Sequence, residues 1–410
     1  MTHQQKLLVV GNGMASVRLC EELAVRCPGR FAITICGAEP QPGYNRVLLS
    51  SFLAGQTKWE DLALRPRSWY EESGMTLLTG ASVCAVDFAA RQALLADNTM
   101  LGFDRLVFAT GSRPVMLPKP GMDLPGVLAF RDLEDAQVAQ GLGEMQADVV
   151  VIGGGLLGIE AANGLARCGA KVTLVHLMDR LMERQLDAPA AGLLRTALAR
   201  KGIRIVLGAD TARIMGDTGV TGLELADGRV LPAQAVICAV GIRPSSELAR
   251  AAGLHVNRGI VVDDAMACAL PGVYALGECA EHRGTVYGLV EPAHEQAAIV
   301  ARQLSGEADA LYFGTLLATN LKVSGVGIFS AGDFMGTATS QASLLEDRDA
   351  GWYRKLVFER EKLTGAILAG DTSDALWYRD LIRSGSDVSA MRHKMIFGQD
   401  FASSPQQQAA

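Results

Sequence analysis

The hydrophobic and polar positions of the chain first describe a strand, a glycine turn, a helix and a second strand. The apolar run 6–10 leads into Gly11, helical spacing continues to about Arg26, and a second apolar run covers 31–36. Short apolar runs bounded by turn residues are typical of strands that are buried on both faces. We therefore expect a β–α–β unit with parallel strands.

The same pattern returns in the middle of the chain. The apolar run 148–152 leads into Gly153, helical spacing continues to about Cys168, and the next apolar run covers 171–176. Gly169 directly follows this helical stretch, at a place where glycine commonly ends a helix. We expect the two halves to be copies of one architecture.

Each half closes with a matching phrase after a set of short strands. Residues 82–108 predict short strands with a turn at Asp97-Asn98, and a turn at Asp227-Gly228 stands at the matching place in the second half. The two closing phrases are Ala109-Thr110-Gly111-Ser112-Arg113-Pro114 and Ala239-Val240-Gly241-Ile242-Arg243-Pro244. A repeated phrase after each repeated glycine turn supports two related units.

After Pro244 the pattern changes, and no third unit of this kind begins. A strand over 273–276 is expected to end at Gly277 and Glu278, and helical spacing covers about 292–304. Further along, the pattern predicts strands around 322–330, 355–359 and 365–369, a helix at 373–384 and a polar, disordered tail.

The bulk composition indicates a globular protein of two or three domains. The chain has 410 residues, of which 49% are hydrophobic and 20% charged. Its net charge is 38 − 44 = −6, which argues against a nucleic acid as partner. No run reaches the roughly 18 uncharged apolar residues of a membrane helix, and the first residues lack the layout of a signal peptide. We therefore expect a cytoplasmic protein with no membrane partner.

The eight cysteines are not arranged as metal ligands or as a redox pair. None of them forms a C-x-x-C or C-x-x-x-x-C motif. The sequence thus predicts no metal site, no iron–sulfur cluster and no redox-active disulfide. In a reducing compartment we expect the cysteines to be free thiols.

The first glycine turn has the pattern of a dinucleotide-binding motif. Its sequence Gly11-Asn12-Gly13-Met14-Ala15-Ser16 follows a strand and opens a helix, so the backbone can approach a pyrophosphate at the helix N-terminus. Ser16 replaces the third glycine and is small enough for the helix to contact the strand. Glu39 stands 39 − 11 = 28 residues after Gly11, where an acid can accept hydrogen bonds from a ribose.

The second glycine turn keeps all three glycines of the motif but lacks the usual acid. The strand ends at His176, where an acidic residue would indicate NADH. Arg180 and Arg184 lie nearby, and together with His176 they leave NADPH open. Glu160, in the first turn of the helix, either interacts with the helix dipole or reaches the nicotinamide amide.

These motifs together resemble the FAD-dependent pyridine-nucleotide oxidoreductases built on the glutathione-reductase plan. The resemblance implies that the first motif binds FAD and that the second, in an inserted unit, binds NADH. The stretch 106–114 is similar to the family's ATG phrase, and 276–278 is similar to its second FAD motif, with Glu278 in place of Asp. The implied fold is α/β, with two Rossmann-like three-layer domains, the second inserted in the first, and a C-terminal α+β domain.

The resemblance also implies domain boundaries. We expect an FAD-binding domain at 1–114 and 245–310, an NAD(P)H-binding domain at 115–244, a C-terminal α+β interface domain at 311–400 and a disordered tail at 401–410.

A narrower resemblance is to the flavoprotein part of NADH-dependent assimilatory nitrite reductase large subunits and to the electron-transfer subunit of bacterial assimilatory nitrate reductase. The segments 44–50, 176–187, 321–325 and 370–374 carry it. It implies NADH despite His176. Because the cysteine-rich and sirohaem regions of those large subunits are lacking here, we expect no reduction of nitrite by this chain alone.

The resemblance implies that hydride passes from NADH to flavin N5 and that electrons then leave singly to an iron–sulfur or molybdenum nitrate reductase catalytic subunit. A first alternative is a reductase of rubredoxin or ferredoxin. Such reductases usually have a lysine beside the flavin, where this chain has Ser51 with Arg46 nearby. A second alternative is an NADH-sensing flavoprotein that acts by changing partners. The basic cluster 392–394 is a candidate contact for an acidic redox protein.

The candidate residues fall into two groups. Glu160 and Arg46 are the candidate catalytic residues. The candidate FAD-binding residues are Gly11, Gly13, Met14, Ala15, Ser16, Glu39, Arg46, Val83, Ala109, Thr110, Gly111, Gly277, Glu278 and Pro292. The candidate NAD(P)H-binding residues are Gly153, Gly155, Leu156, Leu157, Gly158, Glu160, His176, Arg180 and Gly241.

Overall fold

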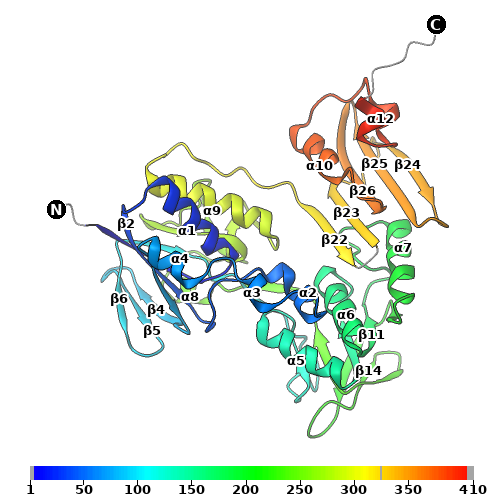
Figure 1. Cartoon of the computed structure of the whole chain (residues 1–410), viewed down its shortest axis with the longest axis horizontal. Coiled ribbons are helices and arrows are strands. Elements are labelled where there is room, and N and C mark those ends of the chain that lie inside the picture. Colours follow the sequence, from blue (N-terminus) through cyan, green and yellow to red (C-terminus); the bar gives the residue numbers. More distant parts are fainter. Residues whose placement is uncertain (1–3, 324–325, 404–410) are drawn as a thin grey trace. The chain divides into compact units, whose positions relative to one another are not determined.

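The structure is a computed structural model that describes residues 4–323 and 326–403 (Figure 1). The chain forms two compact units, and the first comprises Met1–Val115, Arg131–Leu133 and Ile242–Thr315. The second unit comprises Met116–Phe130, Glu134–Gly241 and Leu316–Ala410. Among the helices of the described residues, none is long and apolar enough to cross a membrane.

A five-stranded parallel sheet forms the centre of the first unit. Its strands in spatial order are β19 (Val273–Ala275), β7 (Arg105–Phe108), β1 (Gln5–Val10), β2 (Phe31–Gly37) and β3 (Thr76–Thr79). The last four residues of β1 are buried, as expected for a strand covered on both faces. Helices α1 (Met14–Arg26) and α9 (Val290–Ser305) lie side by side against this sheet (Figure 1).

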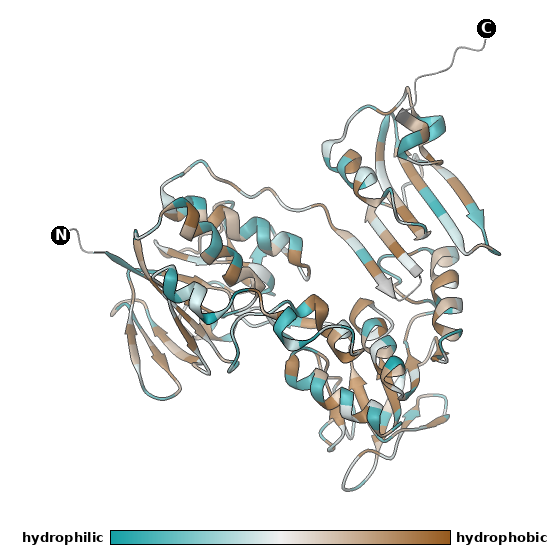
Figure 2. Cartoon of the chain, in the orientation of Figure 1, coloured by the Kyte–Doolittle hydropathy of each residue, from teal (hydrophilic) through white to brown (hydrophobic). Residues whose placement is uncertain are grey.

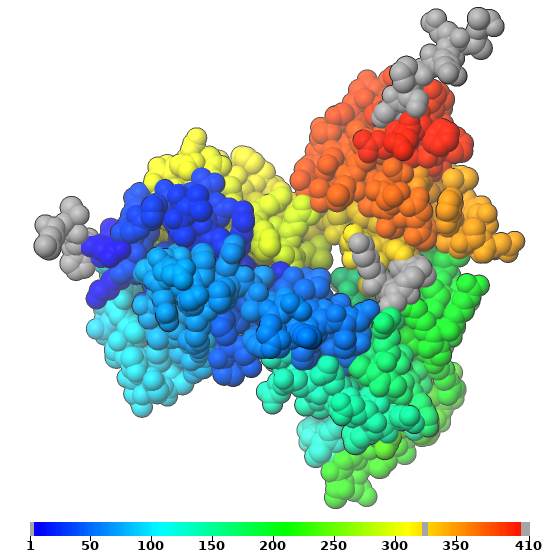
Figure 3. Space-filling model, viewed as in Figure 1, coloured from blue at the N-terminus to red at the C-terminus, as the bar shows by residue number. Residues whose placement is uncertain are grey.

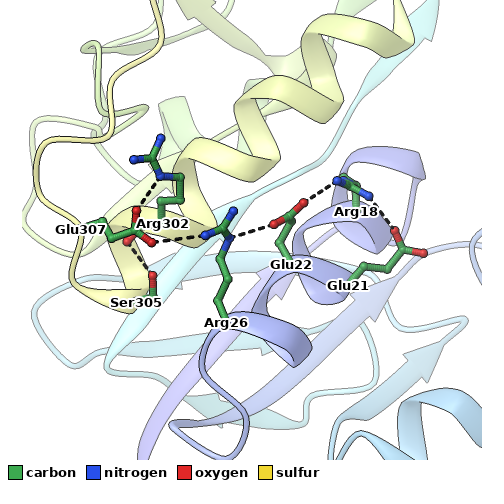
Figure 4. Close-up of polar contacts among 7 residues, drawn as sticks. All are labelled: Arg18, Glu21, Glu22, Arg26, Arg302, Ser305 and Glu307. Carbon is green, nitrogen blue, oxygen red and sulfur yellow. Dashed lines mark hydrogen bonds and ion pairs between the residues drawn. The ribbon is translucent and has the colours of Figure 1, made fainter.

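A chain of ion pairs joins α1 to the end of α9 (Figure 4). Glu22 accepts from Arg18 and, at 2.8 Å, from Arg26. Arg26 also lies 3.3 Å from Glu307, which accepts from Arg302 at 2.7 Å. Because all these groups are partly exposed, each pair contributes little stability, and the burial of apolar side chains holds the helices together.

The remaining elements of the first unit are short. Its antiparallel sheets consist of β4 (Val83–Asp87), β5 (Gln92–Leu95) and β6 (Met100–Gly102), and of β8 (Ser112–Pro114) with β17 (Ile242–Pro244); a mixed sheet holds β18 (Ile260–Val262), β20 (Ala280–His282) and β21 (Thr285–Val286). Its short helices are η1 (Arg46–Leu48), α2 (Leu49–Leu53), α3 (Trp59–Leu62), α4 (Arg67–Glu72), α8 (Glu247–Ala251) and η2 (Gly277–Cys279).

The second unit contains a second five-stranded parallel sheet. Its strands in spatial order are β12 (Arg204–Val206), β11 (Lys171–Val175), β10 (Asp148–Ile152), β16 (Ala235–Cys238) and β9 (Val127–Leu128). The accompanying elements are α5 (Leu133–Glu144), α6 (Leu156–Cys168), α7 (Ala188–Ala199) and the antiparallel strands β13 (Thr211–Met215), β14 (Gly222–Leu225) and β15 (Val230–Pro232). Gly169 ends α6 with φ +105°, as the sequence predicts.

The C-terminal part of the second unit is an antiparallel sheet with three helices. The strands in spatial order are β22 (Ala318–Val323), β23 (Val326–Gly332), β26 (Lys362–Gly370), β25 (Trp352–Glu359) and β24 (Gln341–Asp347). The helices are α10 (Ala375–Ser384), α11 (Arg392–Met395) and α12 (Gln399–Ser403). In Figure 3 the elements from β24 onward are orange to red, and β22 and β23 are yellow. Helix α7, which is apolar along most of its length in Figure 2, packs against β23, β25 and β26.

The predicted fold class is confirmed, with corrections in the C-terminal part. The stretch 322–330 is two antiparallel strands, β22 and β23, with residues 324–325 outside the described residues. Strand β24 was not predicted, because its side chains are half-buried or exposed along the whole strand and leave no hydrophobic alternation. The predicted tail 401–410 is wrong at its start, since α12 continues to Ser403; residues 404–410 lie outside the described residues.

Candidate functional site

The first glycine turn packs directly against the closing phrase of its unit. Gly11 has φ +114°, and a Cβ atom there would lie 2.1 Å from the carbonyl oxygen of Ala109. Gly13 precedes α1 as its N-cap without any side-chain cap, and a Cβ atom on Gly13 would meet nothing within 4 Å. The start of α1 therefore has open space beside Gly13 and no side chain that caps its first amide groups, an arrangement that suits a bound phosphate.

Buried polar atoms around this turn fit a bound polar group. Among the described residues, Asn12 Oδ1, Ser16 Oγ and Gln296 Nε2 are buried without a hydrogen-bond partner. Gln296 Oε1 accepts from the backbone N–H of Gly277 at 2.8 Å, and a Cβ atom on Gly277 would lie 3.1 Å from Ala15 Cβ. The two predicted FAD motifs thus meet in space. Since unpaired buried polar atoms are costly, a ligand with hydrogen-bonding groups suits this place.

Glu39 lies just beyond β2 and is held by two neighbours. Tyr44 donates to Glu39 Oε2 at 2.7 Å, and Arg46 forms an ion pair with Oε1. Arg46 also donates to the carbonyl oxygen of Arg131 at 3.0 Å, and its guanidinium lies 5.0 Å from the centre of the Tyr44 ring. The structure therefore joins Glu39 and Arg46, which the sequence proposed separately. Arg46 orients the carboxylate that is the candidate ribose ligand.

Glu278 is anchored by two residues that sequence reasoning missed. Its Oε2 atom accepts from Ser112 Oγ at 2.7 Å and forms an ion pair with Arg131. Ser112 directly follows Gly111 in the closing phrase, so the motif itself could have pointed to it. Arg131 lies in no motif, but the segment Arg131–Leu133 returns to the first unit between two parts of the second. The hydroxyl group of Thr110 donates a hydrogen bond to the carbonyl oxygen of Ser245 at 2.6 Å.

The second glycine turn repeats the geometry of the first. Gly153 has φ +120°, and a Cβ atom there would lie 2.2 Å from the carbonyl oxygen of Ala239. On Gly158 a Cβ atom would lie 1.9 Å from the Gly153 carbonyl oxygen, so α6 approaches the turn closely. Gly155 is the N-cap of α6 without a side-chain cap, and a Cβ atom on it would meet nothing within 4 Å. The chain therefore has two such helix N-termini, one at α1 in the first unit and one at α6 in the second.

His176, directly after β11, points into the second turn rather than into solvent. Its Nδ1 atom accepts from the Gly154 N–H at 3.0 Å, and its Nε2 atom lies 3.0 Å from Glu183 Oε2. Arg180 donates to Asp179 at 3.1 Å, whereas Arg184 is 86% exposed. The structure thus brings the predicted histidine to the second glycine turn and adds an acid, Glu183, that sequence reasoning missed.

Glu160 lies on α6, on the turn that follows Gly158. Burial raises the pKa of its carboxyl group to about 7. Within the described residues it makes no hydrogen bond or ion pair. A carboxyl group that is part protonated at neutral pH can both donate and accept, which suits the carboxamide of a nicotinamide.

The other predicted residues are distributed over the same two units. Met14 and Ala15 begin α1, and Leu156 and Leu157 begin α6. Val83 begins β4; the preceding segment is close to Glu39, whose carbonyl oxygen accepts from the Gly80 N–H at 2.9 Å. Pro292 is buried in α9, and Gly241 is exposed directly before β17.

In the predicted basic cluster 392–394, Arg392 already contacts neighbouring side chains. Arg392 lies over the Phe358 ring at 4.4 Å and donates to Gln341 at 2.8 Å. These residues line a surface recess of about 530 Å³ in the C-terminal part. Among the described residues, no cluster of three or more histidine, cysteine or acidic side chains could hold a metal ion.

Comparison with known proteins agrees with this geometry. The pyridine nucleotide-disulphide oxidoreductase family matches residues 5–297, and the rubredoxin NAD+ reductase C-terminal domain matches 318–386. The NAD(P)H nitrite reductase of Bacillus subtilis is 44% identical over 94% of this chain and 48% of its own length. The assimilatory nitrate reductase electron transfer subunit of the same organism is 40% identical over 96% of this chain and 51% of its own length. The chain thus spans about half the length of these curated relatives.

A solved structure is similar over almost the whole chain. The reductase of the covalent putidaredoxin reductase–putidaredoxin complex superimposes with a TM-score of 0.85 at 26% identity, covering 93% of both chains. The chain therefore belongs to the pyridine nucleotide-disulphide oxidoreductase family, an FAD-binding family that uses NAD(P)H.

Proposed function

We propose that this chain is an FAD-dependent NADH oxidoreductase that passes electrons to a redox partner of nitrate or nitrite assimilation. The observation that carries this proposal is the presence of two glycine turns of one geometry, each with an open helix N-terminus beyond Gly13 or Gly155. Two dinucleotide sites in one chain suit transfer between a bound and an exchanging nucleotide. The names of the two Bacillus subtilis relatives support nitrate or nitrite assimilation as the setting.

In this proposal the first unit holds FAD and the second exchanges NADH. The turn at 11–16 faces the pyrophosphate, Glu39 accepts the ribose hydroxyls and Glu278 accepts the hydroxyls of the ribityl chain. Arg46 and Arg131 hold these two carboxylates in place. When bound, FAD accepts a hydride from a nicotinamide and can release its two electrons singly, which suits a one-electron protein acceptor.

The cysteines support an acceptor outside the chain. All eight are free in the described residues. Burial raises the pKa of Cys20 to about 12 and that of Cys36 to about 11. A thiol with so high a pKa is protonated at neutral pH and reacts poorly. We therefore expect electrons to leave to another molecule rather than through a disulfide of this chain.

Turnover with purified FAD-loaded protein tests the proposal. NADH should reduce the flavin rapidly, and ferricyanide should sustain turnover. Addition of the nitrate reductase catalytic subunit from the same cell should couple NADH oxidation to nitrate reduction. If NADH bleaches the flavin only slowly and no acceptor accelerates it, electron transfer is the wrong function, and an NADH sensor that changes partners replaces it.

A reductase of rubredoxin is the second candidate. The match of residues 318–386 to the rubredoxin NAD+ reductase C-terminal domain favours it. Such reductases usually have a lysine beside the flavin, and Ser51 in its place argues against this candidate. Rates of NADH oxidation with purified rubredoxin, ferredoxin and nitrate reductase, compared at equal concentrations, discriminate between the candidates.

A further inference from the structure

The loop between β11 and α7 is fixed to the second glycine turn from both sides. The Gly154 N–H donates to His176 Nδ1 at 3.0 Å, and the Met182 N–H donates to the Gly154 carbonyl oxygen at 2.9 Å. A Cβ atom on Gly154 would lie 2.6 Å from His176 Cγ, so only glycine fits against the ring. The loop therefore has a defined place beside the open N-terminus of α6.

The hydrogen bonds of His176 fix its tautomer and orient Glu183. Because Nδ1 accepts the Gly154 N–H, it carries no proton, and the ring proton of the neutral histidine is on Nε2. Nε2 then donates to Glu183 Oε2 at 3.0 Å. The side chains of His176 and Glu183 are 11% and 22% exposed, so the carboxylate is held at the edge of solvent. An acid thus lies beside the end of β11. It is held there by the histidine at the strand end, whereas the usual acid of the motif is the strand-end residue itself.

The two arginines of this loop already have acidic partners. Arg180 donates to Asp179 at 3.1 Å and to the Leu186 carbonyl oxygen at 3.4 Å. Arg184 Nε lies 3.8 Å from Glu183 Oε1. The loop therefore lacks the excess positive charge that a 2′-phosphate group needs.

We propose that Glu183 selects NADH over NADPH by accepting hydrogen bonds from the adenosine ribose and repelling a 2′-phosphate, with His176 as its positioning residue. The inference rests on the proposed function, in which the second glycine turn binds the exchanging dinucleotide. It gives His176 a role that its position at the end of a strand does not explain. A neutral imidazole there does not replace the missing acid but holds a carboxylate that comes from the loop.

Binding of ADP-ribose and of its 2′-phosphorylated form to the FAD-loaded protein tests the inference without any electron transfer. Isothermal calorimetry should show tighter binding of ADP-ribose to the wild type. Glu183→Gln removes the charge and keeps the size, and should lower the preference for ADP-ribose about tenfold. Asp217→Asn is the control, because Asp217 is an exposed acid of the same unit that lies outside the loop; it should leave the preference unchanged.

A rescue variant separates this role from a structural one. His176→Asp combined with Glu183→Gln places an acid at the strand end itself and should restore the preference for ADP-ribose. An unchanged preference in Glu183→Gln, or an equal fall in Asp217→Asn, would overturn the inference and leave the proposed function intact. If neither ligand binds the wild type, both the inference and the proposed second nucleotide site are wrong.

Discussion

The hydroxyl group of Tyr353 donates a 2.6 Å hydrogen bond to Oδ2 of Asp187, and both residues are buried. Oδ1 of the same carboxylate accepts from the Ala190 N–H at 3.3 Å and caps α7. Lys355 Nζ lies 3.4 Å from Oδ2. One carboxylate therefore joins strand β25 of the C-terminal sheet to α7, the helix that follows the loop at the second glycine turn.

Replacement of Tyr353 by phenylalanine should destabilise the protein. The change leaves the buried Asp187 carboxylate with one donor fewer, which costs about 1–2 kcal/mol. Urea unfolding followed by circular dichroism should show a lower midpoint with an unchanged slope. Tyr274→Phe is the control, because within the described residues the Tyr274 hydroxyl has no hydrogen bond. Equal losses in the two variants would show that the bond to Asp187 contributes nothing specific.

Glutamate in place of Gly13 or Gly155 should show which of the two proposed nucleotide sites binds FAD and which binds NADH. A Cβ atom at either position would meet nothing within 4 Å, so the new side chain fits without moving the backbone. Its charge occupies the space that a pyrophosphate needs and repels it. Gly155→Glu should keep bound FAD and lose reduction by NADH, whereas Gly13→Glu should be purified without flavin.

The flavin absorbance of each purified variant and its bleaching by NADH are the two measurements. Gly141→Glu is a suitable control, since Gly141 in α5 has equal space around it and lies in no glycine motif. Loss of FAD from Gly155→Glu would mean that the two halves are assigned in the wrong order.

The raised pKa of Glu160 should make stability depend on pH. Burial raises the pKa from 4.5 to about 7, so the folded protein binds this proton more tightly than the unfolded chain does. Stability should therefore fall as the pH rises from about 4.5 to about 7, by about 1.4 kcal/mol per unit of pKa shift. Glu160→Gln should remove this fall.

Urea midpoints at about pH 5 and about pH 7.5 measure the effect for the wild type and the variant. The exposed Glu71 provides the control variant Glu71→Gln, which should keep the wild-type dependence. A wild-type slope that persists in Glu160→Gln would assign the pH dependence to another group.

Arg46→Ala should weaken FAD binding, because Glu39 then loses the cation that orients it. We expect the dissociation constant for FAD to rise about tenfold or more, measured by fluorescence during dialysis against decreasing FAD. Arg65→Ala is matched to it, since Arg65 also pairs with an acid, Glu21, and lies over an aromatic ring, that of Trp69. A similar loss in Arg65→Ala would indicate general destabilisation rather than an effect on the site.

The glycine turns could be predicted from sequence because their backbone geometry requires particular residues. Gly11 and Gly153 are needed where each turn meets a distant carbonyl group, and that requirement is visible as a motif. The contact between Arg131 and Glu278 could not be predicted, because it depends on a segment that crosses back into the first unit. Glu183 was missed for a related reason. Its position depends on a turn in which Met182 has φ +50°, and no sequence motif predicts that turn.

The two closing phrases pair with each other as strands β8 and β17, with Arg113 opposite Arg243. The point at which the chain leaves the first unit therefore lies beside the point at which it returns. Because only Arg131–Leu133 otherwise re-enters that unit, the intervening segment is connected as a module with adjacent ends. A segment attached in this way can be exchanged through two joins that lie side by side, provided that the C-terminal sheet packed against its helix α7 is exchanged with it.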